Sequence, residues 1–251
     1  MKGAANMKTK LFTVGDSNPK TAKSVQLGYQ TFVLHFAPWN VSGHQACPVA
    51  TASECHGPCL NLAGRGGIFK AGESTNNIQA ARIRRTKYFF EDRAAFMVAL
   101  YKDIQAGIRY AKKLGLVPVF RLNGTSDIPW EKIRFSIDGQ DYRNIMAAFP
   151  DVQFYDYTKI PGRVTPQNYA LTFSRSARNE LNVIKSMARG DNVAVVFDHS
   201  KPMPSEFLGR PVINGDDHDL RFLDDRGVIV GLKAKGPARR DNSGFVVRGA
   251  A

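Results

Sequence analysis

The stretch LVPVFRLNGTSD, residues Leu116–Asp127, decides the fold, because an apolar segment turns abruptly into a polar tip. Its β-branched and aromatic residues predict a strand. A helix is predicted just before it, over Asp92–Leu114, where apolar residues recur at steps of three and four and Gly115 can end the helix. A helix leading into a strand with a polar tip is typical of a parallel sheet that binds ligands at the carboxyl ends of its strands.

The same order recurs along the chain. Five more strands are predicted at Tyr29–Phe36, Val152–Lys159, Tyr169–Ser176, Asn192–Ser200 and Gly227–Lys235, with helices at Tyr142–Ala148 and Ala177–Arg189. Six strands predict an α/β fold, a partial (β/α)6 TIM-like barrel with mostly parallel strands. Residues 27–236 are expected to form this one domain. Residues 1–26 are expected to be a flexible basic N-terminal arm, and residues 237–251 a C-terminal tail.

The charge of the chain is strongly positive, with 35 Lys and Arg against 22 Asp and Glu and a net charge of +13. This excess favours nucleic acid or a nucleotide as partner, although a basic surface can also serve solubility alone. No apolar run approaches the roughly 18 residues of a membrane span, so no membrane partner is expected. The first residues lack the apolar core of a secretory signal, and we therefore expect a cytoplasmic location.

All three cysteines lie in HQACPVATASECHGPCLNLAGRGG, residues His44–Gly67. The spacing is Cys47-x7-Cys55-x3-Cys59, and clustered thiols in a reducing compartment favour iron–sulfur clusters or zinc. Three ligands leave one coordination position open, which suits a reactive site. Zinc remains an alternative, because His44 would complete a Cys3His tetrahedron. Three unligated thiols are the third interpretation.

Two further segments allow a functional and a structural interpretation. In NGDDHDLRFLDD, residues Asn214–Asp225, the consecutive Asp216, Asp217, His218 and Asp219 could bind a divalent metal or act as general acid and base. The alternative is a turn whose side chains cap their own backbone. In Gln79–Arg93 arginines adjoin aromatic residues, which suits nucleic acid but also a helix with core aromatics and solvated arginines.

The chain resembles the radical S-adenosylmethionine (radical SAM) enzymes in three features. These are a cysteine loop after the first strand, a polar tip on the second strand and an order of six β/α units. Their usual loop is C-x3-C-x2-C, tighter than the loop of this chain. The resemblance implies a [4Fe-4S] cluster on Cys47, Cys55 and Cys59, with S-adenosylmethionine at the open iron. It places further cofactor contacts at Asn123, Gly124, Thr125, Ser126 and Asp127 near the methionyl amine, at Ser174 and Arg175 near the ribose or carboxylate, and at Gly231 beside the adenine.

A second resemblance covers more of the chain. The strings CPVATASECHGPCLNLAGRGG, RLNGTSDIPWE, FYDYTKI, NYALTFS and GVIVGLKAK look like a phage-borne family, the gene product eighty-eight-like group. This likeness spans roughly Tyr29 to Lys235 and implies a phage or prophage origin, hence the cytoplasm of the host. It implies no activity.

Three hypotheses follow from the sequence. The first is a radical SAM-like iron–sulfur enzyme of phage origin with an unknown substrate, for which a nucleotide-containing molecule is one candidate. The second is a zinc-stapled phage protein that binds nucleic acid without catalysis. The third is a metal-dependent hydrolase that uses Asp216–Asp219.

Overall fold

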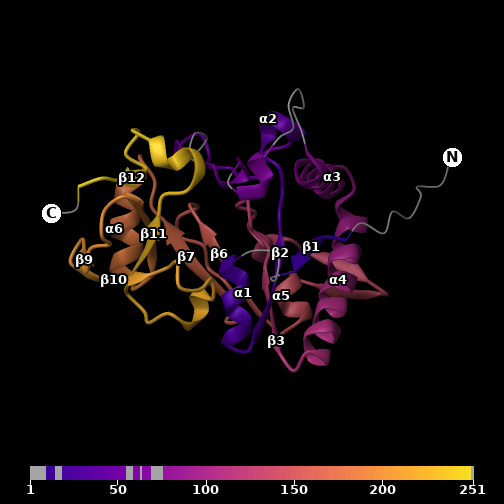
Figure 1. The fold of residues 1–251 in the computed structure, drawn as a ribbon. Coiled ribbons are helices and arrows are strands. Elements are labelled where there is room, and N and C mark those ends of the chain that lie inside the picture. The colour runs from indigo at the N-terminus through magenta and orange to yellow at the C-terminus, as the bar shows by residue number, and fades with distance from the viewer. Residues whose placement is uncertain (1–9, 15–18, 55–58, 63, 69–75, 250–251) are drawn as a thin grey trace.

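A mostly parallel sheet dominates the computed structural model, which describes residues 10–14, 19–54, 59–62, 64–68 and 76–249. Within these residues the sheet has ten strands, in the order β1-β2-β3-β6-β7-β8-β11-β10-β9, with β12 beside β8 (Figure 1). Their bounds are β1 Phe12–Val14, β2 Tyr29–Leu34, β3 Val117–Arg121, β6 Gln153–Thr158, β7 Tyr169–Ser174, β8 Val193–Phe197, β9 Glu206–Phe207, β10 Arg210–Asn214, β11 Ile229–Lys233 and β12 Val246–Val247. The six predicted strands are β2, β3, β6, β7, β8 and β11, and consecutive members pair in parallel.

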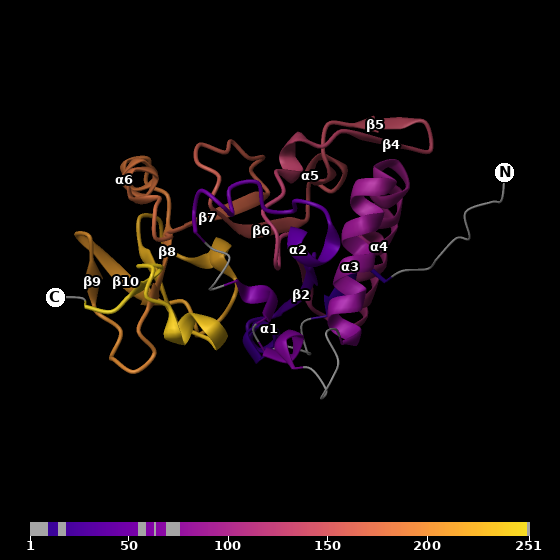
Figure 2. The same ribbon diagram turned by 90° about the horizontal axis from the view of Figure 1, so that it is seen from above.

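The sheet does not close into a barrel. Its path ends at β1 and β9, which pair antiparallel with β2 and β10. The α/β class and the mostly parallel order are thus confirmed, whereas the partial TIM-like barrel is not. Seen from above, the strands follow an open arc (Figure 2). The structure also adds β10 beyond the predicted strands, in parallel with β11.

Helices cover the convex side of the arc. They are α4 Arg93–Lys113, α5 Ile145–Ala148 and α6 Glu180–Ala188, while α1 Pro19–Gln26 lies on the opposite, concave side (Figure 2). Helix α2 Trp39–Ser42 follows β2, and α3 Asn77–Glu91 packs on α2 and α4. Helix α4 matches its prediction. Its stripe of Met97, Leu100 and Ile104 is buried against Phe120 and Phe154 of the sheet. None of the described helices is long and apolar enough to cross a membrane.

Short elements complete the described chain. They are the 3-10 turns η2 Leu60–Leu62, η3 Gly64–Gly67, η4 Trp130–Lys132, η5 Arg221–Leu223 and η6 Gly236–Arg240, and a hairpin of β4 Phe135–Ile137 and β5 Gln140–Tyr142. The predicted helix Tyr142–Ala148 therefore begins later, at Ile145.

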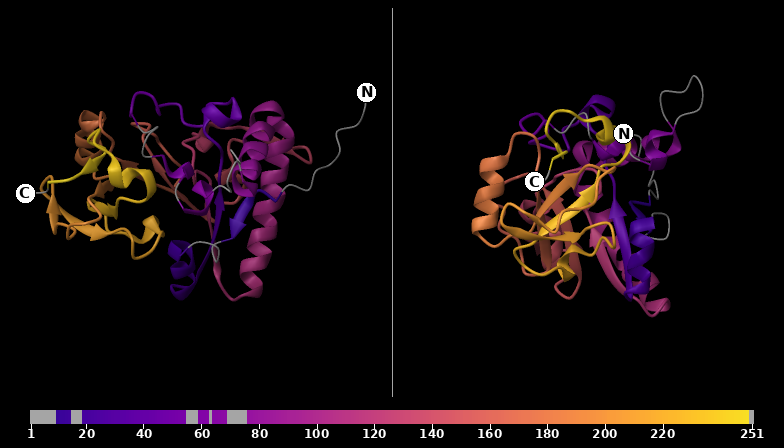
Figure 3. Two further views of the ribbon diagram at one scale, coloured as in Figure 1. Left: turned by 45° about the horizontal axis from the view of Figure 1, so that its top comes forward. Right: turned by 60° about the vertical axis from the view of Figure 1, so that its left-hand side comes forward.

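Both ends of the described chain join the sheet. Strand β1, from the predicted arm, pairs with β2, and Leu11 and Phe12 beside it are buried. From the predicted tail, Val246 and Val247 pair with Val196 and Phe197 of β8. Figure 3 shows this yellow C-terminal segment over the sheet, where η6 contacts η2. These segments fold because their apolar residues find partners far away in the sequence.

Candidate functional site

The cysteine loop and the polar tip of β3 form one assembly at the carboxyl ends of the parallel strands, at the top of Figure 1. The hydroxyl of Thr125 donates to the carbonyl of Phe36 (2.6 Å), just after β2. The backbone N–H of Asp127 donates to the carbonyl of Ala46 (2.9 Å). Beside it, Sγ of Cys47 lies 4.0 Å from the carbonyl oxygen of Thr125. Hydrogen bonds thus bind the start of the loop to the tip of the next strand.

The predicted metal ligands are described only in part. Cys47 and Cys59 are each partly exposed, and the N–H of Asn61 points at Sγ of Cys59 (3.5 Å). Cys55 lies outside the described residues. Among the described residues no group of three metal-ligating side chains occurs. The three-cysteine site therefore stays a prediction.

His44, the proposed fourth zinc ligand, is engaged by helix α3. Its ring stacks on Phe90 with centroids 4.9 Å apart and planes inclined by 5°. Its Nε2 lies 3.4 Å from a carboxylate oxygen of Glu91. One ring nitrogen is therefore directed at a carboxylate of this helix.

At the tip of β3, the side chain of Asn123 builds the turn. Its amide oxygen accepts from Ser126 Oγ (2.8 Å), Ile128 N (2.9 Å) and Trp130 Nε1 (3.1 Å). Gly124 is required by close packing, because a Cβ there would lie 2.6 Å from Nδ1 of His35. These contacts give Asn123, Gly124 and Ser126 a structural role, and the cofactor contacts assigned to them remain predictions.

Asp127 is likewise hydrogen-bonded on both carboxylate oxygens. Oδ1 accepts from the hydroxyl of Thr158 (2.8 Å) and lies 3.2 Å from Nη1 of Arg163. Oδ2 accepts from the backbone N–H of Lys159 (2.7 Å). Asp127 thereby joins the tip of β3 to the carboxyl end of β6. Burial raises the pKa of Asp127, although these donors oppose the shift.

At the tip of β7, Ser174 and Arg175 also have partners within the protein. Ser174 Oγ accepts from the ammonium of Lys159 (2.9 Å). Arg175 donates to the carbonyl of Gly244 (2.8 Å), and so fastens the C-terminal segment to β7. It also lies 3.4 Å from Glu180.

Gly231 lies in the middle of β11. A Cβ added there would come within 2.3 Å of Met203 Sδ and 2.8 Å of Val212 Cγ1. The glycine therefore allows Met203 to pack on the strand. On that side of Gly231, the space that the resemblance gives to an adenine is filled by protein.

The acidic segment after β10 is tied to the sheet through separate contacts. Asp216 accepts from the N–H of Lys233 (2.9 Å) and pairs with the ammonium of Lys235 (2.8 Å). Asp217 accepts from the amide of Asn214 (2.7 Å). The structural interpretation, side chains that cap their own backbone, describes Asn214, whose amide oxygen accepts from the N–H of Asp216 (3.1 Å).

The other two residues of this segment, His218 and Asp219, each contact an arginine. Nδ1 of His218 lies 3.1 Å from a guanidinium nitrogen of Arg221. Asp219 is buried and pairs with Arg121 of β3 at 2.9 Å. The catalytic role of Asp216, Asp217, His218 and Asp219 stays a prediction that these contacts do not require.

Sequence reasoning missed a polar cluster with two arginines, in which Arg82 is buried and the other three residues are partly buried: His35, Arg82, Arg121 and Tyr157. Arg82 is 8% exposed, so the expectation of solvated arginines on α3 is wrong for this residue. Burial, together with the positive charges of Arg82, Arg121 and Arg85, lowers the pKa of His35 from 6.5 to about 3. The guanidinium of Arg121 covers the Tyr157 ring at 4.9 Å. A histidine and an arginine at the ends of neighbouring strands were the available signal.

A buried carboxyl group fills a gap in the sheet next to this cluster. Strands β3 and β6 pair only at Val119↔Gln153 and Phe120↔Phe154. Beyond this point Asp156 accepts from the N–H of Asn123 (2.7 Å) and from the hydroxyl of Tyr169 (2.8 Å). Burial raises the pKa of Asp156 to about 7, although Arg121 opposes the shift.

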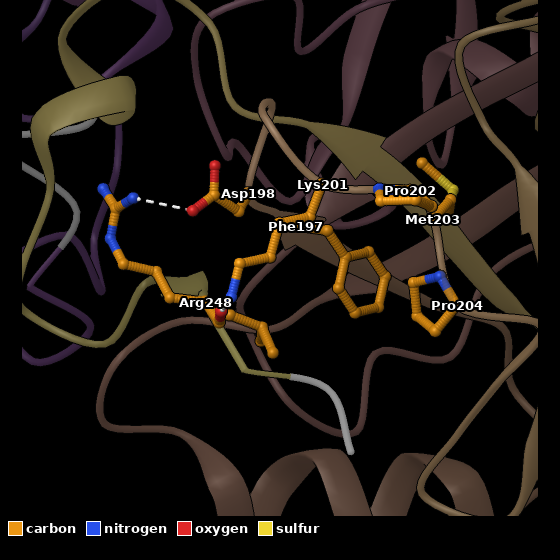
Figure 4. Close-up of a pocket in the computed structure, with 8 residues that line it drawn as sticks. Phe197, Asp198, Lys201, Pro202, Met203, Pro204 and Arg248 are labelled. Carbon is orange, nitrogen blue, oxygen red and sulfur yellow. Dashed lines mark hydrogen bonds and ion pairs between the residues drawn. The ribbon is translucent and has the colours of Figure 1, made fainter.

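A pocket of about 260 Å³ opens at the carboxyl end of β8 (Figure 4). Phe197, Met203 and Val247 are among the residues that line it. At its rim Asp198 pairs with Arg248 at 3.1 Å, the dashed line in Figure 4. Asp198 is therefore held by a neighbour in the protein.

The family is decided by a match over almost the whole chain. The family model described as Gene product 88 matches residues 6–249. The chain belongs to the Gene product 88 family. The likeness to a phage gene product family is thus confirmed, whereas the comparisons give no support to the radical SAM likeness. No curated protein and no solved structure matches the chain.

Proposed function

We propose that this member of the Gene product 88 family is a radical SAM-like iron–sulfur enzyme. Cys47, Cys55 and Cys59 would hold a [4Fe-4S] cluster, and S-adenosylmethionine would bind the iron left without a cysteine. Such a cluster, when bound, supplies an electron to the sulfonium of its partner. The net charge of +13 favours a substrate that carries a nucleotide.

One observation supports this proposal most: the cysteine loop is bound to the tip of β3 at the carboxyl end of a parallel sheet. The contact of Cys47 with the Thr125 carbonyl puts a cysteine sulfur at the edge where α/β enzymes bind their ligands. Thiolates are the donors that iron–sulfur clusters take, so the described residues fit the group. Thr125 and Asp127, through their bonds to Phe36 and Ala46, would orient the loop.

The zinc alternative needs a fourth protein ligand. The stacking of His44 on Phe90 and its contact with Glu91 favour a site that keeps one position open. The two hypotheses differ in metal content and in the role of this histidine.

The test is the metal content of the full chain prepared without oxygen. We expect about four iron and four sulfide per chain, with brown colour from thiolate-ligated iron. Cys47→Ser should remove most of the iron, whereas His44→Ala, the matched control, should retain it. One zinc per chain that is lost in His44→Ala would overturn the proposal in favour of the zinc-stapled protein. So would a metal-free chain after reconstitution with iron and sulfide.

A further inference from the structure

We propose that His35, Arg82, Arg121 and Tyr157 form a binding site for the phosphate group of a ligand, on the concave side of the sheet. The cluster lies at the carboxyl ends of β2 and β3, next to the cysteine loop. The site does not rest on the proposed iron–sulfur cluster, because none of its four residues is a metal ligand.

Each of the four residues has a polar atom that makes no hydrogen bond within the described part of the chain. Nδ1 of His35, Nε of Arg82, Nε of Arg121 and the hydroxyl of Tyr157 are buried, and within the described part of the chain none of these atoms has a hydrogen-bond partner. Buried polar atoms are rarely left unsatisfied, because each costs about 1–3 kcal/mol. Four such atoms on neighbouring elements point to an acceptor that binds from outside the chain.

The charge of the Arg82 guanidinium also points to an anion. Arg82 donates through Nη1 to the carbonyl and the side-chain oxygen of Asn61, at 2.7 and 2.9 Å, and both acceptors are neutral. Among the described residues no carboxylate forms an ion pair with it. Burial lowers the pKa of Arg82, but a guanidinium stays charged at neutral pH. An uncompensated buried charge is costly, and a bound anion would compensate it.

These groups lie close together. The N–H of Ala37, two residues after His35, donates to the hydroxyl of Thr86 (2.8 Å), which donates to the carbonyl of Arg82 (2.8 Å). Arg121 contacts the Tyr157 ring at 4.9 Å. Gly124, at the tip of the same strand as Arg121, packs against the His35 ring. The four groups therefore belong to one region of the concave face.

The donors of the site favour a phosphate group as the anion. Arg121 already pairs with Asp219 at 2.9 Å, and Asp156 lies 3.9 Å from its Nε. Arg82 has no such partner among the described residues, and His35 stays neutral, so that its ring can donate one hydrogen bond. A phosphate group offers several acceptor oxygens for four donors that come from different directions, and arginine binds phosphate with good geometry.

The test measures the binding of inorganic phosphate to the full chain at constant ionic strength, with chloride as the reference salt. Titration calorimetry and the phosphate-dependent rise in melting temperature should both report binding beyond that of chloride. Arg82→Met should weaken binding at least tenfold. Arg84→Met, which removes an exposed arginine of the same helix, should leave binding unchanged.

Tyr157→Phe keeps the test decisive if Arg82→Met fails to fold. It removes only a hydroxyl without a partner among the described residues, and should weaken phosphate binding about fivefold. Binding no tighter than that of chloride, or equal binding by wild type and Tyr157→Phe, would overturn the proposal.

A variant with all three cysteines changed to serine separates this site from the iron–sulfur proposal. It should bind phosphate as the wild type does while it holds no iron. If phosphate binding vanished in this folded variant, the four residues would not form the site by themselves. A nucleoside 5′-monophosphate that binds more tightly than inorganic phosphate would identify the ligand class as a nucleotide.

Discussion

The concave face of the sheet carries polar and charged side chains at the carboxyl ends of β2, β3 and β6, whereas it is apolar where β8 and β11 form it, and the Tyr157 ring packs on that apolar cluster. His35, Arg121 and Tyr157 occupy the first part. Ala194 and Val230 are buried in the second, where they pack with Leu232. An apolar face is covered by ordinary core packing, whereas buried charges need specific partners. The difference separates a part of the sheet that only supports the fold from a part that is built around charge.

The same contrast appears in how the strands separate at their carboxyl ends. Between β3 and β6 the gap is filled by the carboxyl group of Asp156. Strands β7 and β8 pair only at Phe173↔Val193 and Ser174↔Ala194, and β12 then pairs with β8. The opening between β3 and β6 is closed by the buried side chain of Asp156, whereas the opening between β7 and β8 is bordered by the backbone of β12. Polar chemistry is therefore concentrated on the side of the cysteine loop.

The largest effect on stability is expected for Arg121→Met, which removes a charge from the polar part of the concave face. Asp219 would lose its partner at 2.9 Å while staying buried. Removing one member of a buried ion pair lowers the free energy of unfolding by about 3–5 kcal/mol, which urea denaturation measures. Arg84→Met, the exposed control, should change it by no more than about 0.5 kcal/mol. A loss below about 1 kcal/mol for Arg121→Met would show that this pair does not support the fold.

The strands were predictable because each carries its own pattern, but their pairings at the edges were not. The alternation in Tyr29–Leu34 and the apolar run in Val193–Phe197 identify strands without any partner. Strand β12 has two residues, and β10 begins with an arginine and a proline. These two segments form strands only because a neighbouring strand leaves backbone groups unpaired at its edge, which is tertiary information.

The candidate site was predictable in position but not in its residues. The polar tip of β3 is at the ligand-binding edge, as expected, yet Asn123 uses its hydrogen bonds on the turn itself, and Asp127 bonds to Thr158 and Lys159 of the neighbouring tip. His35 and Arg121 stood in strands whose alternation gives two faces. The sequence does not tell which face the helices leave uncovered. Arg82 was assigned to solvent because an amphipathic pattern cannot show a loop that folds over a helix.

Asp156→Asn should show an intermediate effect that depends on pH. The folded-state pKa, raised by burial to about 7 from an ordinary value of 3.8, means that the folded chain holds this proton more tightly than the unfolded chain does. The contribution of Asp156 to stability is therefore present at low pH and is lost as pH rises from about 4 to 7, by up to about 1.4 kcal/mol per pH unit. Asparagine does not titrate. Relative to wild type, the variant should gain stability between pH 4 and 8 in urea denaturation, and an unchanged difference would contradict this reasoning.

Asp198→Asn, at the end of β8, should have the smallest effect and the opposite sign. Hydrogen bonds from the N–H and the hydroxyl of Ser200, with a contribution from Arg248, lower the pKa of Asp198 to about 2. A lowered pKa means that the ionised form is the one that the fold favours, so its contribution is present above pH 4 and is lost as pH falls toward 2. The variant should therefore be less stable than wild type at pH 6 and should approach it at pH 2.5. If Asp156→Asn and Asp198→Asn instead shifted stability in the same direction with rising pH, the carboxyl ends of β6 and β8 would share one environment, and the contrast between the two parts of the sheet would not hold.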